Sequence, residues 1–127
     1  VAMLSFSNFG NPGWDTANRV REAVSMMDSR ITDFEYDGEM SADVALNPDL
    51  RELYPFSRLS GPANVLIMPA LHSANISSKL LQELGGGTVI GPILVGLTKA
   101  VQIAAMGASV GDLVNMAALA AHEAARR

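Results

Sequence analysis

The sequence predicts an α/β protein built around a mostly parallel sheet. Short apolar runs typical of buried strands, such as 1–7 and 63–68, alternate with stretches of helical periodicity. The length of 127 residues suits one small domain. Hydrophobic residues make up 49% of the chain and aromatic residues only 6%, so we expect a core of aliphatic and methionine side chains.

The first predicted elements are a strand, a helix and a second strand. The apolar run 1–7 ends in polar residues, as a buried parallel strand would. A helix is expected to open at Asp15 or Thr16. Its apolar face recurs at the spacing of one helical side: Val20, Ala23, Val24 and Met27. Alternation over 31–36 indicates the second strand.

The middle of the chain predicts a short helix, a connection and a third strand. Asn47 followed by Pro48 is a good helix start, and we expect that helix to run over 48–53. Two prolines and a glycine make 54–62 a candidate internal linker. The strand 63–68 follows, and Pro69 ends it.

The last part predicts two further helices separated by extended pieces. Asn75 is expected to cap a helix with the apolar stripe Ile76, Leu80 and Leu84. The glycines 85–87 follow that helix and precede a strand, the reverse of the order in a phosphate loop, so they indicate a helix end. Short extended pieces are expected at 88–90, 93–95 and 101–103. Ser109 and Asp112 form a capping pair for a final helix reaching about Glu123.

Composition excludes several classes of partner. The net charge is −4, from 9 basic and 13 acidic residues, and the basic residues form no patch, so we expect no nucleic-acid partner. No apolar run has the length of a membrane span, so no membrane partner is expected. The absence of cysteine is compatible with a reducing, cytoplasmic location. Because the chain starts at Val1 rather than Met, we expect a fragment of a longer protein.

Acidic residues gather in one stretch at alternate positions: Asp33, Glu35, Asp37 and Glu39. A divalent metal site and a solvated acidic edge both explain this spacing, and we predict no metal site. The glycine between Asp37 and Glu39 indicates a sharp turn after a strand, which would present both carboxylates at the carboxyl edge of the sheet. Ligand crevices of open α/β sheets form at that edge.

Other candidate ligand-binding residues lie at strand and helix ends. Ser5 and Ser7 end the first predicted strand and could donate hydrogen bonds to a ligand, although turn roles explain them equally well. Asn75 needs no ligand if it caps a helix, yet the N-terminus of that helix could also receive a phosphate.

Several motifs together resemble the phosphate acetyl/butaryl transferase family. The stretch 91–109 resembles the signature GPI-x-x-G-x-x-KPVNDLSRG-x-S of phosphate acetyltransferases. Asp37-Gly38-Glu39, Asn75-Ile76 and Asp112-Leu113-Val114-Asn115 are similar to further family motifs. The closer likeness is to the C-terminal, acetyltransferase-like domain of bacterial hybrid NAD(P)-dependent malic enzymes, which residues 6–10 resemble more than they resemble the free-standing transferases.

The chain departs from the active pattern at the positions that the resemblance marks as catalytic. The family's adjacent Ser-Arg falls on Ala105 and Met106, and an upstream substrate-binding arginine falls on Glu83. The aspartate of another family motif falls on Ala70, while the aspartate after the signature is kept as Asp112. We therefore expect no catalytic residues here. The resemblance leaves Gly91, Pro92 and Asp112 as candidate ligand-binding residues beside those named above.

The resemblance also implies a fold and a function. It implies that 1–127 is the C-terminal portion of a three-layer, parallel-sheet domain of the isocitrate/isopropylmalate dehydrogenase-like type. The function expected is that of an acetyl-CoA-sensing regulatory and oligomerisation domain, within a homo-oligomeric malic enzyme whose N-terminal part binds NAD(P) and a divalent metal. No cofactor is expected in this region, and acetyl-CoA is the expected allosteric ligand. The alternatives are an active acetyl- or butyryltransferase and a purely structural oligomerisation module.

Overall fold

The structure is a computed structural model that describes residues 1–30 and 32–126. The chain divides into two compact units, 1–79 and 80–127. We describe each unit by itself. Among the described residues, no helix combines the length and the apolar character that crossing a membrane requires.

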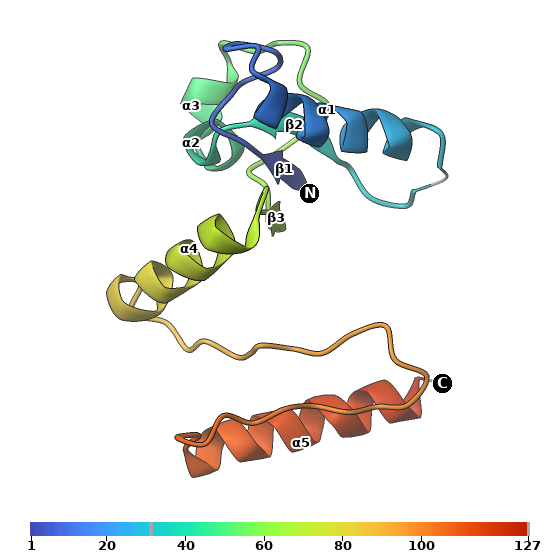
Figure 1. Ribbon diagram of the computed structural model, residues 1–127, viewed down its shortest axis with the longest axis vertical. Coiled ribbons are helices and arrows are strands. Elements are labelled where there is room, and N and C mark those ends of the chain that lie inside the picture. Colours follow the sequence, from blue (N-terminus) through green and yellow to red (C-terminus); the bar gives the residue numbers. More distant parts are fainter. Residues whose placement is uncertain (31, 127) are drawn as a thin grey trace. The chain divides into compact units, whose positions relative to one another are not determined.

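The first unit contains a small parallel sheet. Its strands are β1 (Ala2–Leu4), β2 (Asp37–Met40) and β3 (Leu66–Ile67). They lie in the order β2-β1-β3, and β1 pairs in parallel with both neighbours (Figure 1). The predicted α/β class with a parallel sheet is therefore confirmed.

The pairing of β1 with β2 is irregular at Glu39. Met3 pairs with Gly38 and Leu4 pairs with Met40, so Glu39 has no partner in the register. An extra residue of this kind is a β-bulge, which bends a strand and changes the direction of a side chain. Gly38 precedes it with a φ of 145°, and a Cβ there would meet the carbonyl oxygen of Met3 at 2.5 Å. Glycine is thus required at this position.

Three helices complete the sheet region: α1 (Asp15–Asp28), α2 (Ala42–Leu46) and α3 (Pro48–Arg51). In Figure 1, α1 lies to one side of the strands and α2 and α3 lie to the other. The helix predicted from Asp15 is confirmed, and its buried side chains are Ala17, Val20 and Val24. The short helix predicted after Asn47 is also confirmed, although it ends at Arg51 rather than at residue 53. The sequence analysis did not predict α2.

The core of the first unit lies between the sheet and the segments after β2. Its buried side chains are Ala2, Leu4, Met40, Val44, Ala45, Leu59 and Ala63. Phe9 and Tyr54 pack against this group from two loops. Leu59 comes from the candidate linker 54–62, so that segment contributes to the core. The expectation of an aliphatic and methionine core is confirmed for this unit.

The second predicted strand is misplaced. Ile31 lies outside the described residues, and 32–36 form no strand. The strand instead covers Asp37–Met40, which the sequence analysis treated as a turn. Alternation of side chains alone predicted 31–36, whereas pairing with β1 determines where the strand is.

The second half of the chain contains α4 (Leu71–Leu84), which crosses from the first unit into the second, and α5 (Val110–Ala125). The prediction that Asn75 caps α4 is wrong, because the helix begins four residues earlier. Its end is as predicted: the Gly85 N–H bonds to the Leu81 carbonyl at 2.9 Å, and Gly86 takes a φ of 62°. The α4 stripe Ile76, Leu80 and Leu84 is exposed.

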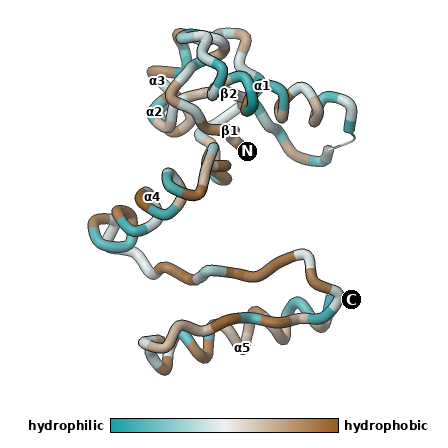
Figure 2. The backbone as a smooth tube through the Cα atoms, in the orientation of Figure 1, coloured by the Kyte–Doolittle hydropathy of each residue, from teal (hydrophilic) through white to brown (hydrophobic). Residues whose placement is uncertain are grey.

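A long segment without regular structure joins α4 to α5. The three extended pieces predicted at 88–90, 93–95 and 101–103 form no strands. Figure 2 shows this segment as largely hydrophobic. The capping pair predicted for α5 is confirmed, since Ser109 and Asp112 form a reciprocal capping box.

Candidate functional site

The first candidate region lies where the loop 5–14, which follows β1, packs against the bulge in β2. Glu39 is fully buried there, at 0% exposure. Its Oε1 accepts hydrogen bonds from the Ser7 hydroxyl and from the Gly10 N–H, each at 2.8 Å. Arg21 on α1 donates from Nη2 to Oε1 at 3.0 Å and from Nε to Oε2 at 3.1 Å. The carboxylate is thus paired and hydrogen-bonded on both oxygens.

This pairing changes the pKa of Glu39. Burial by itself raises the pKa, but the hydrogen bonds from Arg21, Ser7 and Gly10 outweigh it and lower the pKa from 4.5 to about 2. Glu39 therefore stays ionised at neutral pH and serves as an internal anchor for the loop. Ser7, fully buried against it, has the same structural role.

Asp37 belongs to a different network. Its Oδ2 accepts from the Arg58 N–H at 2.7 Å and from the Ser57 hydroxyl at 2.9 Å. Its Oδ1 accepts from the Gly38 N–H at 2.9 Å and lies 3.4 Å from Arg58 Nε. The bulge thus separates the two carboxylates, which bind different partners. Both hold loops in place.

The structure brings together some of the sequence-predicted site residues. Ser5 lies beside Ser7, whose N–H donates to the Ser5 Oγ at 3.3 Å. Arg21 and Arg58 were not predicted. The signal for them was indirect: a carboxylate buried in a sheet needs a cationic or hydrogen-bonding partner, and the sequence does not say which arginine supplies it.

A second candidate region lies at the start of α4. Leu71, His72, Asn75 and Ile76 line a pocket of about 260 Å³ there. Asn75 and His72 are exposed, so the amide and the imidazole are accessible to a ligand. The chemistry available is hydrogen bonding beside apolar side chains, close to the N-terminus of a 14-residue helix.

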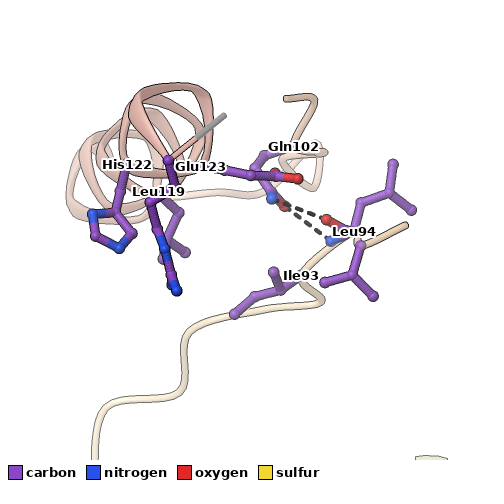
Figure 3. Close-up of a pocket in the computed structure, with 8 residues that line it drawn as sticks. Ile93, Leu94, Gln102, Leu119, His122 and Glu123 are labelled. Atoms are coloured by element: carbon purple, nitrogen blue, oxygen red, sulfur yellow. Dashed lines mark hydrogen bonds between the residues drawn. The ribbon is translucent and has the colours of Figure 1, made fainter. Parts of the chain in front are cut away.

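The second unit has a pocket of its own, of about 320 Å³, between α5 and the segment before it. Ile93, Leu94, Val95 and Leu119 provide its apolar surface, and His122, Glu123 and Arg126 its ionisable groups (Figure 3). The Gln102 side chain accepts from the Leu94 N–H at 3.0 Å and donates to the Leu94 carbonyl at 3.1 Å. Gln102 therefore fixes the backbone along one wall.

The remaining predicted positions lie on separate parts of the second unit. Gly91 has a φ of 147° and precedes Pro92 in the irregular segment. The Asp112 carboxylate accepts from the Ser109 N–H at 2.9 Å and the Ser109 hydroxyl at 2.8 Å, and these bonds lower its pKa. Met106 is fully exposed in the turn before α5. Among the described residues, no three His, Asp or Glu side chains are grouped as metal ligands would be.

The class that this architecture defines is an α/β protein with a small parallel sheet, whose strand β1 is followed by the loop 5–14. A family model described as phosphate acetyl/butaryl transferase matches residues 1–121, and the chain belongs to that family. The solved structure of EutD phosphotransacetylase from Staphylococcus aureus matches with a TM-score of 0.89 and 36% identity, over 97% of this chain and 39% of that one. The chain shares its fold over that region.

Curated relatives of this chain include malic enzymes and phosphate acetyltransferases. The NADP-dependent malic enzyme of Rhizobium meliloti is 66% identical over 124 residues, which cover 98% of this chain and 16% of that enzyme. The NADP-dependent malic enzyme of Escherichia coli is 40% identical over 98% of this chain and 17% of its own length. The phosphate acetyltransferase of Treponema pallidum is 42% identical over 90% of this chain and 35% of its own length. The chain therefore spans a minor part of each, and the resemblance to both groups is confirmed.

Proposed function

We propose that this chain is part of an acetyl-CoA-sensing regulatory and oligomerisation domain of an NAD(P)-dependent malic enzyme. The observation that carries the proposal is the pair Ala105 and Met106, which stands where the resemblance places the Ser-Arg of active transferases. This pair occurs in a chain that is 66% identical to a malic enzyme over nearly its whole length.

The side chains at these positions have no means of stabilising an acyl phosphate. A methyl group and a thioether supply neither positive charge nor a hydrogen-bond donor, and Glu83 brings a negative charge where the family has an arginine. Transfer between a phosphate and a thioester develops negative charge that the site must stabilise. The loss of two cationic groups therefore favours binding without turnover.

Asn75 is the residue best placed to contact a ligand. It is exposed, lines the pocket at the start of α4, and belongs to a motif that resembles the family's. Asp37 and Glu39 are poorer candidates, because their oxygens already accept bonds from neighbouring residues. Ser5, Gly91 and Pro92 remain secondary candidates. Acyl-CoA binding can outlast catalysis because coenzyme A has a large nucleotide portion that contacts other residues.

The parent protein that we propose is a cytoplasmic homo-oligomer. Its malic enzyme portion lies in the same polypeptide and holds the NAD(P) and the divalent metal. The present region contributes to a three-layer architecture of the isocitrate/isopropylmalate dehydrogenase-like type. Its ligand is acetyl-CoA or another acyl-CoA, and binding shifts an oligomer between states of different malate oxidation activity.

The test is malate-dependent reduction of NAD(P) by the intact parent while acetyl-CoA is titrated. We expect saturable inhibition, and we expect Asn75→Ala to weaken the apparent affinity about tenfold or more, because a hydrogen bond to a charged ligand contributes roughly 1.5–3 kcal/mol. The matched control is Asn18→Ala, which removes a side-chain amide from α1. It should leave the acetyl-CoA titration curve unchanged. If the rate of NAD(P) reduction by the wild-type parent does not change with acetyl-CoA concentration, the proposal is wrong.

A working transferase is the second candidate, because relatives named phosphate acetyltransferases share 42% and 40% identity with this chain. Phosphate-dependent release of free thiol from acetyl-CoA by the parent would favour it. A purely structural module would instead give oligomers whose melting temperature does not change when acetyl-CoA is added. The three candidates thus differ in measurements made on one preparation.

A further inference from the structure

The segment 88–103 has the composition of sheet strands but none of their pairing. Its β-branched side chains are of the type that favours strands, and each is exposed: Val89, Ile90, Ile93, Val95, Val101 and Ile103. Among the described residues, no backbone–backbone hydrogen bond involves 88–95 or 101–103. Continuous apolar runs are typical of strands that are buried on both faces of a sheet. The segment therefore has the chemistry of a strand without a neighbouring strand.

One hydrogen-bonding edge of the segment is already occupied at Leu94. The Gln102 side chain accepts from the Leu94 N–H and donates to the Leu94 carbonyl, as a neighbouring peptide group would (Figure 3). In an extended chain, the backbone polar groups of successive residues point to opposite edges. Ile93 and Val95 would therefore offer their N–H and C=O groups at the other edge, where a further strand can pair.

The second unit has almost no core of its own. Among its described residues, Met116 on α5 is the one buried hydrophobic side chain. Val110, Leu113 and Val114 on the same helix are exposed. A unit of this length must bury far more apolar surface to offset the conformational entropy that is lost on folding. More chain must therefore cover it in the folded protein.

The length of the relatives indicates which chain provides this cover. The family match runs over 1–121 and so includes the segment 88–103. This chain covers 39% of the EutD phosphotransacetylase, which shares its fold, but only 16% of the Rhizobium meliloti malic enzyme. The same segment thus occurs in a protein less than half as long as the malic enzyme. What covers it is therefore expected in the domain that the two proteins share.

We propose that 88–95 and 101–103 are strands of a sheet that is completed within the same polypeptide, by the part of the transferase-like domain outside residues 1–127. The added strand pairs with the backbone of Ile93 and Val95. A second copy of the chain is a poorer partner, because the unit that would dock has no core until it is covered. The inference follows from the family and from the geometry of the second unit, and it does not depend on acetyl-CoA sensing.

The first test is amide hydrogen exchange in the intact parent, followed by mass spectrometry of peptides. We expect 88–95 and 101–103 to exchange about a hundredfold or more slowly than 32–36. The segment 32–36 is the control, because it also has the alternation of a strand, yet its N–H groups form no hydrogen bond within the described chain. Exchange of 88–95 and 101–103 as fast as that of 32–36 would overturn the proposal.

Photo-leucine, a diazirine analogue of leucine, identifies what covers the segment in the wild-type parent. We expect the peptide that contains Leu94 to link to the transferase-like domain outside residues 1–127. Oligomers assembled from heavy-isotope and light-isotope subunits distinguish links within one polypeptide from links between copies. Links to the malic enzyme portion, or links found only between copies, would each show that the proposal is wrong.

A charge at Val95 tests the same cover by substitution. Val95 is 76% exposed in the described chain, so an aspartate there would have little effect if the surface stayed in water. Beneath an added strand, the same charge would be buried without a partner. Val95→Asp should therefore speed exchange of 88–95 at least about tenfold, whereas Val95→Ile should keep it slow. Unchanged exchange in a Val95→Asp parent that circular dichroism shows to be folded would contradict the proposal.

Discussion

The guanidinium of Arg21 contacts both oxygens of the Glu39 carboxylate, with Nη2 3.0 Å from Oε1 and Nε 3.1 Å from Oε2. The arginine side chain is 42% exposed and the glutamate side chain is fully buried. The pair therefore joins the surface of α1 to the bulge in β2. It also fixes the loop 5–14, because the same carboxylate accepts from the Ser7 hydroxyl and the Gly10 N–H.

Removing the arginine should destabilise the protein. Arg21→Met keeps most of the apolar stem but leaves a buried carboxylate without its cation, and we expect a loss of about 1–3 kcal/mol in the free energy of unfolding. Urea unfolding followed by circular dichroism measures this loss. Arg19→Met on the same helix is the control, since Arg19 is exposed and should change stability by less than about 0.5 kcal/mol. Equal effects of the two substitutions would contradict the role assigned to the pair.

The stabilisation from Glu39 should depend on pH. Its pKa in the folded protein is about 2, below the ordinary 4.5, so the folded state favours the ionised form. The contribution, on the order of 3 kcal/mol, is present above pH 4.5 and is lost as the pH falls toward 2. Unfolding measured between pH 6 and pH 3 should therefore show wild type and Glu39→Gln converging on the acid side. A difference that stays constant with pH would exclude this linkage.

Gly38 should not tolerate a side chain. In Gly38→Ala the new Cβ would lie 2.5 Å from the Met3 carbonyl oxygen, at a φ of 145° that alanine rarely adopts. We expect a loss of roughly 2 kcal/mol or more, measured by urea unfolding. Gly61→Ala is the matched control, because a Cβ at Gly61 meets nothing within 4 Å. If Gly38→Ala leaves the free energy of unfolding unchanged, the bulge can rearrange to accept a side chain.

The capping box of α5 gives a prediction for the second unit. Ser109→Ala removes the acceptor of the Asp112 N–H bond and should cost about 1 kcal/mol of helix stability. Amide hydrogen exchange in the first turn of α5 reports this directly as faster exchange. Ser78→Ala, within α4, should leave exchange in that turn unchanged. Unchanged exchange in a folded Ser109→Ala protein would contradict the capping role of Ser109.

The sequence predicted the helices better than the strands. The helix opening at Asp15 and the final helix after Ser109, expected to reach about Glu123, were recognised because apolar spacing and capping residues lie within the same short segment as the helix they define. The start of α4 was misjudged, since Asn75 is a good cap by residue type but the helix already begins at Leu71. The pieces at 88–103 had the composition of strands and form none in the structure.

The candidate site was only partly predictable. The sequence indicated Ser7 and Glu39 as polar residues near a sheet edge, and they do contact each other. It gave no indication that this contact is buried inside the protein. It also did not indicate that Arg21 is the third member and pairs with the Glu39 carboxylate. A local pattern identifies a residue that needs a partner but does not identify that partner when it lies 18 positions away.

The sequence by itself determined the α/β class, the starts of α1 and α5, and the resemblance to the phosphate acetyl/butaryl transferase family. Only the tertiary structure decided that β2 covers Asp37–Met40, that Glu39 is a bulge, and that Arg21 neutralises it. The physical reason is the range of the interactions. Helix hydrogen bonds and caps connect residues a few positions apart, whereas strand pairing and buried charge pairs form between distant segments and depend on how the whole chain packs.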